Sequence, residues 1–258
     1  MRFASLGSGS EGNGLLVHAG NTCLLLDCGF SIADTARRLA RLDLTPENIH
    51  GIVVTHEHDD HVGGVPGFAR KHDIPVYLTH GTLTATGVSR FEGVVVNIID
   101  SHDALPVRNI ELRPFPVPHD AREPTQFVFS DGDKSLGVLT DTGVSTSHIE
   151  SMLSAVDALV LECNHDLELL MNSAYPYSLK QRIAGRLGHL DNSSASGMLG
   201  ALLPVNKGRM QHVIAAHLSK QNNTPALARR ALAGALGCDD SWIGVATQDE
   251  GFGWREIH

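Results

Sequence analysis

A dense group of potential metal ligands follows the apolar segment 51–55. Within six residues the chain places His56, His58, Asp60 and His61. In an extended segment His56 and His58 project to the same side, so their ring nitrogens can bind one ion at about 2.0–2.1 Å. Asp60 and His61 follow after a turn and can reach a second ion nearby. This density of imidazoles and carboxylates predicts a metal site rather than a plain solvated loop.

Three further candidate ligands occur later in the chain, and two of them, Asp141 and His217, directly follow predicted strands. His119 stands in Val-Pro-His-Asp-Ala, Asp141 follows the apolar run 136–140, and His217 stands in Ala-Ala-His-Leu-Ser-Lys. A lone histidine is more often structural than ligating. The occurrence of all three in order after the dense group favours ligation instead.

The elements that must position these residues follow from the apolar patterns. Short β-branched runs bounded by Gly, Asp or Asn predict strands at residues 15–18, 23–27, 52–55, 94–99, 126–129, 136–140, 158–162, 213–216 and 242–246. Periodic patterns predict helices near residues 31–42, 61–72, 146–153, 179–187, 193–203 and 224–236. This mixture indicates an α/β fold with two sheets packed face to face and helices outside.

Composition sets broad limits on the protein. The 258 residues contain no repeat or linker-like tract, which predicts one domain, 1–258. No run approaches membrane-spanning length and no signal-peptide pattern opens the chain, so we expect a cytoplasmic protein that does not bind membranes. The net charge of −9 argues against a broad DNA-coating surface. The absence of C-x-x-C pairs predicts buried, reduced thiols at Cys23, Cys28, Cys163 and Cys238.

The pattern His-x-His-x-Asp-His after a strand resembles the signature of the metallo-β-lactamase superfamily, and the later motifs match in order. The resemblance implies a four-layer αββα fold with two divalent ions. It assigns one ion to His56, His58, His119 and Asp141, and the other to Asp60, His61, Asp141 and His217. Asp27, at the end of a predicted strand, is expected to support the histidine segment from behind the ligands.

The ligand types narrow the chemistry. His at position 58, rather than Glu, argues against the redox di-iron branch, and Asp at position 141, rather than Cys, argues against the main β-lactamase branch. A pair of ions about 3.5–4 Å apart can hold a bridging hydroxide as nucleophile, which Asp60 could orient or deprotonate. Manganese or zinc suits the ligand set, and iron is possible. The ligands alone leave ester, thioester, lactone and phosphodiester substrates open.

Flanking segments offer candidate substrate contacts. The glycine-rich turn 5–14, with Ser8 and Asn13, could cradle an anion through its amides or be a flexible hairpin loop. His165 follows a predicted strand. Basic side chains that could contact phosphates stand near the later motifs: Lys180, Arg182 and Lys220.

These segments together resemble the YycJ-type (WalJ-like) exonuclease subgroup of the superfamily. The shared motifs are Ser8-Gly9-Ser10, Asn164-His165-Asp166, Tyr175-Pro176 with Leu179-Lys180, Gly188-His189-Leu190, and the segment 217–223. The resemblance implies metal-dependent cleavage of DNA from a 5′ end. His189 has the relative position of a histidine that protonates the leaving oxygen in related RNA-processing members; a histidine that caps a helix or supports the ligands from behind is the alternative. Glu11 and Asp191 depart from the subgroup pattern, and both add negative charge where phosphate would bind.

Two alternatives stay open at this point. A small-molecule hydrolase acting on a thioester, lactone or cyclic phosphate would use the same two-metal site, and the acidic net charge favours it. A non-catalytic metal-binding module is opposed by the intact ligand set. Aromatic residues make up only 5% of the chain, so composition predicts no stacking platform for single-stranded bases. The oligomeric state is not indicated.

Overall fold

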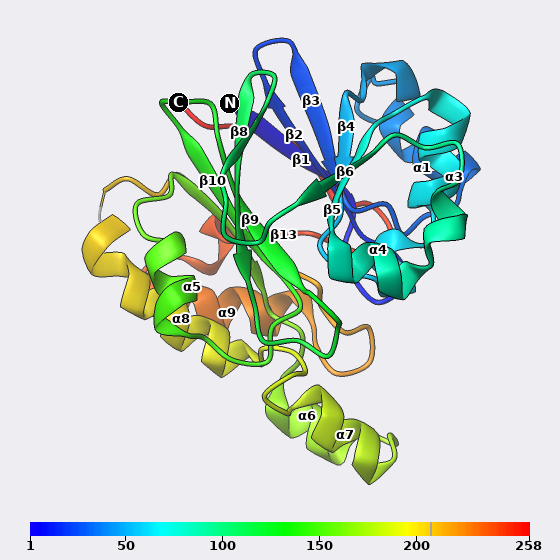
Figure 1. The fold of residues 1–258 in the computed structure, drawn as a ribbon. Helices are drawn as coiled ribbons and strands as arrows, with labels where there is room; N and C mark the ends of the chain where they lie inside the picture. Colours follow the sequence, from blue (N-terminus) through cyan, green and yellow to red (C-terminus); the bar gives the residue numbers. More distant parts are fainter. Residues whose placement is uncertain (207) are drawn as a thin grey trace.

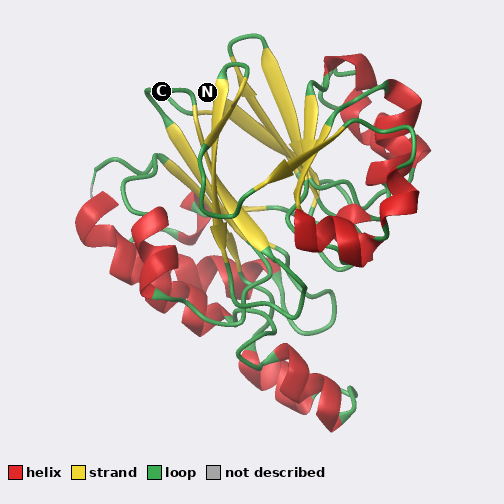
Figure 2. Ribbon diagram, viewed as in Figure 1, coloured by secondary structure: helices red, strands yellow, loops and turns green. Residues whose placement is uncertain are grey.

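Two seven-stranded sheets face each other in the computed structural model, which describes residues 1–206 and 208–258. Helices cover the outer face of each sheet (Figures 1 and 2). The predicted αββα fold is therefore confirmed. No helix among the described residues is long and apolar enough to cross a membrane.

The first sheet is built mainly from the N-terminal half, with one strand from the C-terminus. Its order is β14 (Phe252–Glu256), β1 (Arg2–Gly7), β2 (Gly14–Ala19), β3 (Thr22–Leu26), β4 (Gly51–Val53), β5 (Val76–Thr79) and β6 (Val96–Ile99). Pairs from β14 to β3 are antiparallel, and pairs from β3 to β6 are parallel. β14 brings the two chain ends together, and the N–H of Ile257 donates to the carbonyl of Met1 at 2.8 Å.

The second sheet repeats this plan. Its order is β13 (Gly244–Val245), β12 (His212–Ala216), β11 (Ala158–Glu162), β10 (Ser135–Leu139), β9 (Thr125–Ser130), β8 (Ile110–Pro116) and β7 (Leu105–Val107). Pairs from β7 to β10 are antiparallel, and pairs from β10 to β13 are parallel.

Strand direction decides where the loops meet. β1, β3 and β4 run the same way, because β1 and β3 both pair antiparallel with β2 while β4 is parallel to β3. By the same reasoning β8, β10, β11 and β12 share one direction. The loops that leave the carboxyl ends of these strands therefore gather at one edge of each sheet, which is where α/β proteins usually form their sites.

The helices are held by apolar side chains on the outer faces of the sheets. Leu39 of α1 and Phe68 of α3 pack on the first sheet, while Ile149 of α5, Leu199 of α8 and Leu232 of α9 pack on the second. The bounds are α1 (Ile32–Ala40), α2 (Asp59–Val62), α3 (Val65–His72), α4 (His80–Thr86), α5 (Ser147–Met152), α6 (Leu167–Asn172), α7 (Tyr177–Ile183), α8 (Asn192–Asn206) and α9 (Pro225–Leu236).

Some predicted elements differ from the structure. The predicted helix 61–72 is split at Gly63 and Gly64 into α2 and α3. The predicted strand 242–246 holds only two strand residues, after a short 3-10 helix at Asp240–Trp242. Strands β1, β5, β7, β8 and β14 are not predicted from the apolar patterns; β14 pairs with β1 from the opposite end of the chain, whereas β7 and β8 form a local hairpin. Cys23, Cys28 and Cys163 are buried free thiols, but Cys238 is exposed, contrary to the prediction.

Candidate metal centre

The dense histidine segment leaves the carboxyl end of β4 and turns into α2. Residues 54–58 form an irregular segment with a bend at Glu57, and His58, in extended backbone, caps α2 with its carbonyl, which accepts from the N–H of His61 at 2.9 Å. The segment places His56 and His58 on one side, and the helical turn then brings His61 back beneath them. The short helix thus divides the segment into two ligand groups.

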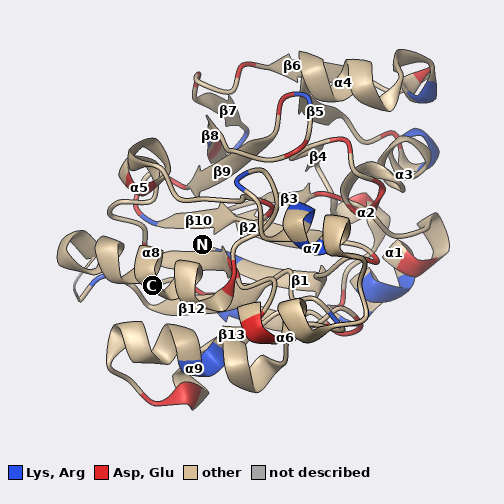
Figure 3. Ribbon diagram, turned by 90° about the horizontal axis from the view of Figure 1, so that it is seen from below, with Lys and Arg blue, Asp and Glu red and all other residues tan. Residues whose placement is uncertain are grey.

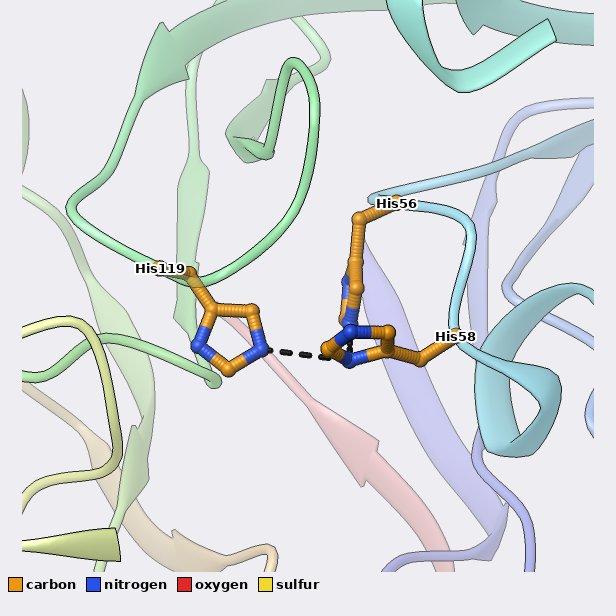
Figure 4. A group of neighbouring side chains, drawn as sticks. All are labelled: His56, His58 and His119. Atoms are coloured by element: carbon orange, nitrogen blue, oxygen red, sulfur yellow. Dashed lines mark hydrogen bonds between the residues drawn. The ribbon is translucent and has the colours of Figure 1, made fainter. Parts of the chain in front are cut away.

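The first group joins His56, His58 and His119, whose rings converge from two loops (Figure 4). His58 Nδ1 lies 3.0 Å from His56 Nε2 and 3.3 Å from His119 Nε2. His119 Nδ1 is 3.0 Å from the carbonyl of Gly188, so Nδ1 carries the proton and Nε2 is left as a lone-pair donor. Three nitrogens facing one point suit a divalent cation.

The second group joins Asp60, His61 and His217. Asp60 Oδ2 lies 3.3 Å from His61 Nε2 and 3.4 Å from His217 Nε2. Both rings are buried, whereas Asp60 is partly open to the cleft. A mixed set of two imidazoles and a carboxylate can also hold a divalent cation.

Asp141 lies between the two groups, and the surroundings of its carboxylate show whether these residues fit a metal ion. It is only 2% exposed, and Oδ2 has no hydrogen-bond partner among the described residues. Oδ2 is 3.2 Å from His61 Nε2, and Oδ1 is 4.0 Å from His119 Nε2. A buried carboxylate oxygen without a donor is unfavourable unless a cation completes its surroundings. These residues therefore fit divalent metal binding, while the identity and number of ions stay a prediction.

Three residues of the centre adopt left-handed backbone directly after a strand. The φ angles of Asp27, Asp141 and His217 are +60°, +52° and +55°. Asp and His tolerate this region better than most residues, but it remains strained. Such a turn stops the strand abruptly and directs the side chain across the end of the sheet. The strain is concentrated where the candidate ligands must converge.

Asp27 lies behind the histidine segment, as the sequence predicted for its place in the fold. Its Oδ1 accepts from the N–H of Thr55 at 2.8 Å, and its Oδ2 accepts from the Thr55 hydroxyl at 2.9 Å. Oδ2 is also 2.8 Å from His61 Nδ1. The carboxylate fixes the proton on Nδ1, which leaves His61 Nε2 free to face Asp141 and Asp60.

The histidines and carboxylates of the centre shift one another's pKa values. Burial alone would lower the pKa of His61 and His217, but Asp141 and other carboxylates raise the pKa of His61 well above its usual value and that of His217 to about 10. Burial lowers the pKa of His56 well below its usual value. Burial disfavours ionised Asp60 and Asp141, yet nearby histidines hold the pKa of both carboxylates below their ordinary values. The centre thus presents anionic oxygens to an incoming cation.

Glu162 is a residue of the site for which no role is predicted from the sequence. It ends β11, is fully buried, and its Oε1 lies 2.8 Å from His189 Nδ1 and 3.2 Å from His217 Nδ1. Its Oε2 accepts from the N–H of Thr142 at 3.0 Å and of Leu190 at 3.1 Å. Burial opposes its ionisation, but His189 and His217 lower the pKa of Glu162 to about 2. The sequence feature that could have revealed Glu162 is a carboxylate at the last position of an otherwise apolar strand.

Most backbone N–H groups of the turn between β1 and β2 donate hydrogen bonds to other residues of the chain. The N–H groups donate within the chain: Ser8 to Thr247 O at 3.0 Å, Gly9 to Asn13 Oδ1 at 2.9 Å, Glu11 to Gln248 Oε1 at 2.8 Å, Gly12 to Gly9 O at 3.2 Å and Asn13 to Asp60 O at 2.8 Å. These groups are not available to cradle an anion. The turn is therefore fixed against the rest of the chain rather than being a flexible loop, and any anion contact by this turn would have to use Ser10, which lines the cleft.

Ser8 and Asn13 contact the candidate ligands directly. Asn13 Nδ2 donates to Asp60 Oδ2 at 3.2 Å and lies 3.1 Å from His61 Nε2. The Ser8 hydroxyl accepts from the N–H of His217 at 2.9 Å. Both side chains thus orient ligands, which is a different use from the substrate contact predicted for them.

The predicted phosphate-binding cations already have partners. Lys220 Nζ lies 2.7 Å from Glu11 Oε2, and Arg182 Nε lies 2.6 Å from Asp120 Oδ2. Lys180 Nζ donates at 2.7 Å to two carbonyls, those of Met171 and Ser173, where α6 ends. His165 is buried, and its Nδ1 lies 3.3 Å from Asn164 Oδ1. Arg182 lines the cleft, whereas Lys180 and His165 hold local structure.

A cleft with a volume of about 370 Å³ opens over the centre. Asp60, Asp141 and His217 form its floor, with His189 beside them, and Tyr175, Arg182 and Ile183 stand on the wall near α7. Both predicted catalytic residues, Asp60 and His189, are therefore accessible from the cleft. Its size suits a group as large as a nucleotide.

Comparisons with known proteins place the chain in a family. Residues 22–213 match the model of the beta-lactamase superfamily domain. The chain is 35% identical over 243 residues to "Exodeoxyribonuclease YycJ" of Bacillus anthracis, covering 92% of this chain and 89% of that protein. It is 33% identical over 248 residues to "Exodeoxyribonuclease WalJ" of Streptococcus pneumoniae, covering 95% and 91%.

A solved structure supports the fold independently. The metallo-β-lactamase fold protein YhfI from Bacillus subtilis aligns with a TM-score of 0.75 at 14% identity, covering 98% of each chain. At that identity the likeness shows the fold alone. The family model and the two full-length relatives carry the assignment further: the chain belongs to the metallo-β-lactamase superfamily and is a relative of the YycJ and WalJ exodeoxyribonucleases.

Proposed function

We propose that this protein is a metal-dependent exodeoxyribonuclease that hydrolyses phosphodiester bonds from the 5′ end of DNA. The observation that carries the proposal is the convergence of two His/Asp groups around buried Asp141 at the floor of a cleft. The YycJ and WalJ relatives support the choice of DNA. A cytoplasmic location fits the free thiols of the chain.

Two divalent ions would be held by the predicted sets, His56, His58, His119 and Asp141 for one, and Asp60, His61, Asp141 and His217 for the other. Bound there, they would supply Lewis acidity toward a phosphoryl oxygen and lower the pKa of a water molecule. We favour manganese in the working enzyme. Zinc and iron also suit imidazole and carboxylate ligands.

Asp60 is positioned to orient the attacking water or receive its proton. Its carboxylate reaches the cleft, while its Oδ2 is held by Asn13 and lies near His61 and His217. Because Asn13 also accepts from Gly9, the carboxylate is fixed by the rigid turn. A fixed oxygen at the cleft floor can present one lone pair in a constant direction.

His189 is the proposed acid. Phosphodiester hydrolysis releases an alkoxide, a poor leaving group that gains from a proton. Burial alone would lower the pKa of His189, but the Glu162 carboxylate at 2.8 Å raises it above its ordinary value. Glu162 therefore favours the protonated ring over the neutral one and fixes its orientation beside the cleft.

The first test is a time course on 5′-labelled duplex DNA with manganese-loaded protein, beside a chelated sample and Asp60→Ala. We expect the label to be released in short products in the first sample alone. Absence of cleavage with two metals bound would contradict the nuclease proposal.

The acid role of His189 needs a separate test. His189→Ala should slow hydrolysis by about 100-fold or more. A substrate whose leaving oxygen is replaced by sulfur needs no proton, so the variant should cleave that substrate nearly as fast as the unmodified protein. Equal slowing on both substrates would assign His189 to structure instead.

A small-molecule hydrolase is the second candidate. The pairing of Arg182 with Asp120 and of Lys220 with Glu11 favours it, because a polyanion would first have to displace these carboxylates. A panel of thioester, lactone and cyclic-phosphate substrates would reveal this activity if DNA is not cleaved.

A further inference from the structure

An arm of residues 167–187, made of α6, α7 and the segment between and after them, projects from the sandwich (Figure 1). Its two ends attach near the centre, since Glu162 precedes it and His189 follows it. Asp166 caps α6 by accepting from the N–H of Leu169 at 3.0 Å, and Lys180 ties α7 to the end of α6. The arm is thus an ordered structure rooted at the site.

The surface of this arm is unusually apolar. Ten large apolar side chains are exposed in the part of the chain that the structure describes, and five belong to the arm: Leu167, Leu169, Met171, Tyr177 and Leu187. Grouped apolar exposure usually marks an interaction surface rather than ordinary solvent contact.

The charge of the arm is opposite to that of the whole protein. The arm carries Lys180, Arg182 and Arg186 against one carboxylate, Glu168, whereas the chain has a net charge of −9. Figure 3 views the molecule from the side on which α6 and α7 project, with basic residues on α7. Arg182 pairs with Asp120, and Arg186 is exposed. An apolar and basic surface in an acidic protein complements a polyanion that also carries apolar faces.

Two of the three tyrosines in the chain flank Pro176 on this arm. Tyr175 is half-buried and lines the cleft together with Arg182 and Ile183. Tyr177 begins α7 and is 74% exposed. One aromatic side chain thus faces the cleft while the other lies on the adjoining surface. Aromatic rings beside a basic surface are the usual means of binding unpaired bases.

The size of the cleft points to the same ligand. At about 370 Å³ it suits one nucleotide at the metal centre, so a terminal base pair would have to open before its nucleotide could enter. The bases next to the entering nucleotide would then be unpaired and need a surface. The arm is continuous with the cleft wall through Tyr175, Arg182 and Ile183.

We propose that the arm 167–187 is a platform on which unpaired bases of single-stranded DNA stack next to the cleft, with Tyr177 as its main stacking residue. This inference rests on the proposed nuclease function and specifies its substrate: DNA ends with single-stranded overhangs bind better than blunt ends. It also revises the composition argument, because a low overall aromatic content conceals two tyrosines gathered at one place.

The test measures binding rather than cleavage. Fluorescently labelled single-stranded and blunt duplex oligonucleotides with hydrolysis-resistant phosphorothioate linkages are titrated with metal-loaded protein, and anisotropy gives Kd. Tyr177→Ala should weaken single-strand binding about 5- to 150-fold, the range for loss of one base stack, and weaken blunt-duplex binding less. Tyr177→Phe should bind like the unmodified protein. Because Tyr177 is mostly exposed, folding should be unaffected, which circular dichroism checks.

Trp242→Ala is the matched control. Trp242 is another exposed aromatic residue, 43% exposed, outside the arm, and its loss should leave Kd unchanged. Unchanged binding by Tyr177→Ala would overturn the platform. So would a change in oligomeric state without a change in DNA affinity, since the arm would then be a contact between copies of the chain.

The platform and the nuclease function can fail separately. Cleavage of DNA by the unmodified protein, with Tyr177→Ala binding normally, removes the platform and leaves the nuclease. Tyr177-dependent binding of single strands without any cleavage supports the platform and removes the nuclease.

Discussion

The floor and the mouth of the cleft are built in opposite ways. At the floor, Asp141, His61 and His217 are each at most 3% exposed, and the residues behind them are fixed by several hydrogen bonds. By the mouth we mean Arg182 on the cleft wall and Lys220, which follows the lining residue Ser219; each of these cations is held by one carboxylate on an exposed surface. Several hydrogen bonds therefore hold the side chains of the floor in place, whereas each cation at the mouth has a single partner that is easily exchanged.

This difference separates two tasks. A buried centre with fixed donors can hold ligands in a constant geometry, which chemistry requires. Exposed ion pairs are weak and exchange readily, so a phosphate can replace a carboxylate at the mouth. Changes at the floor should therefore act on metal affinity and turnover, and changes at the mouth should act on substrate affinity alone.

The largest effect should come from Asp141→Asn, which keeps the shape but removes the charge between the two ligand groups. Loss of a direct ligand should exceed the about 10- to 100-fold loss typical of residues behind the ligands, in both metal affinity and activity. Mass spectrometry of the native protein measures the metal content of the variant and so detects the loss of metal affinity. Asp157→Asn, a buried carboxylate bonded to Ser135 and Arg209, should lower thermal stability and leave metal content unchanged.

Asp27 offers a smaller change at the floor. Asp27→Ala should reduce metal affinity about 10- to 100-fold by freeing His61 to rotate and change tautomer. Asp27→Asn should be nearly as damaging, because its amide would donate to His61 Nδ1 and leave the proton on Nε2, which faces Asp60 and Asp141. An Asn variant with normal metal affinity would show that Asp27 only fills space.

How far the sequence predicts these two regions differs for a physical reason. The candidate ligands are recognisable because their residue types are unusual at strand ends, and the structure brings all of them together. Glu162 and Asn13 were given no orienting role because their importance depends on neighbours far along the chain, such as His217 and Asp60. The periodicity of apolar residues does not predict such contacts between distant residues.

The same limit explains one missed strand. β14 pairs with β1 from the opposite end of the chain, Glu256 with Arg2, so β14 could not be placed from local pattern. The mouth was harder still. Lys220 and Glu11 lie far apart in sequence, and only the fold shows that the expected phosphate ligand already has a partner.

Metal binding should release protons, and this property separates the floor from the mouth without any mutation. His217 has a pKa raised to about 10, chiefly by Asp141 against the opposing effect of burial, so at neutral pH its ring is protonated. Ligation requires the neutral ring, and metal must therefore displace that proton. Apparent metal affinity should rise with pH up to about this pKa. Calorimetry in buffers of different ionisation enthalpy counts the protons; a pH-independent affinity would contradict the assignment of His217.

The smallest effect is expected at the mouth, from Glu11→Gln. The Glu11 carboxylate lies 2.7 Å from Lys220 Nζ, and both side chains are exposed, so its removal frees Lys220 for a phosphate without disturbing the floor. DNA affinity should rise about two- to fivefold. One additional phosphate contact should also steepen the dependence of log affinity on log salt by about 0.7 to 0.9.

A matched control separates local pairing from overall charge. Glu47→Gln removes the same charge at an exposed position of the short 3-10 helix Pro46–Asn48, and its salt slope should equal that of the unmodified protein. Adding Lys220→Gln to Glu11→Gln should abolish the gain. If both single Glu variants steepen the slope equally, net charge alone governs DNA affinity, and the mouth has no specific cation. If only Glu11→Gln does, Lys220 is a phosphate ligand that its own chain holds in check, and metal content should be the same in every variant.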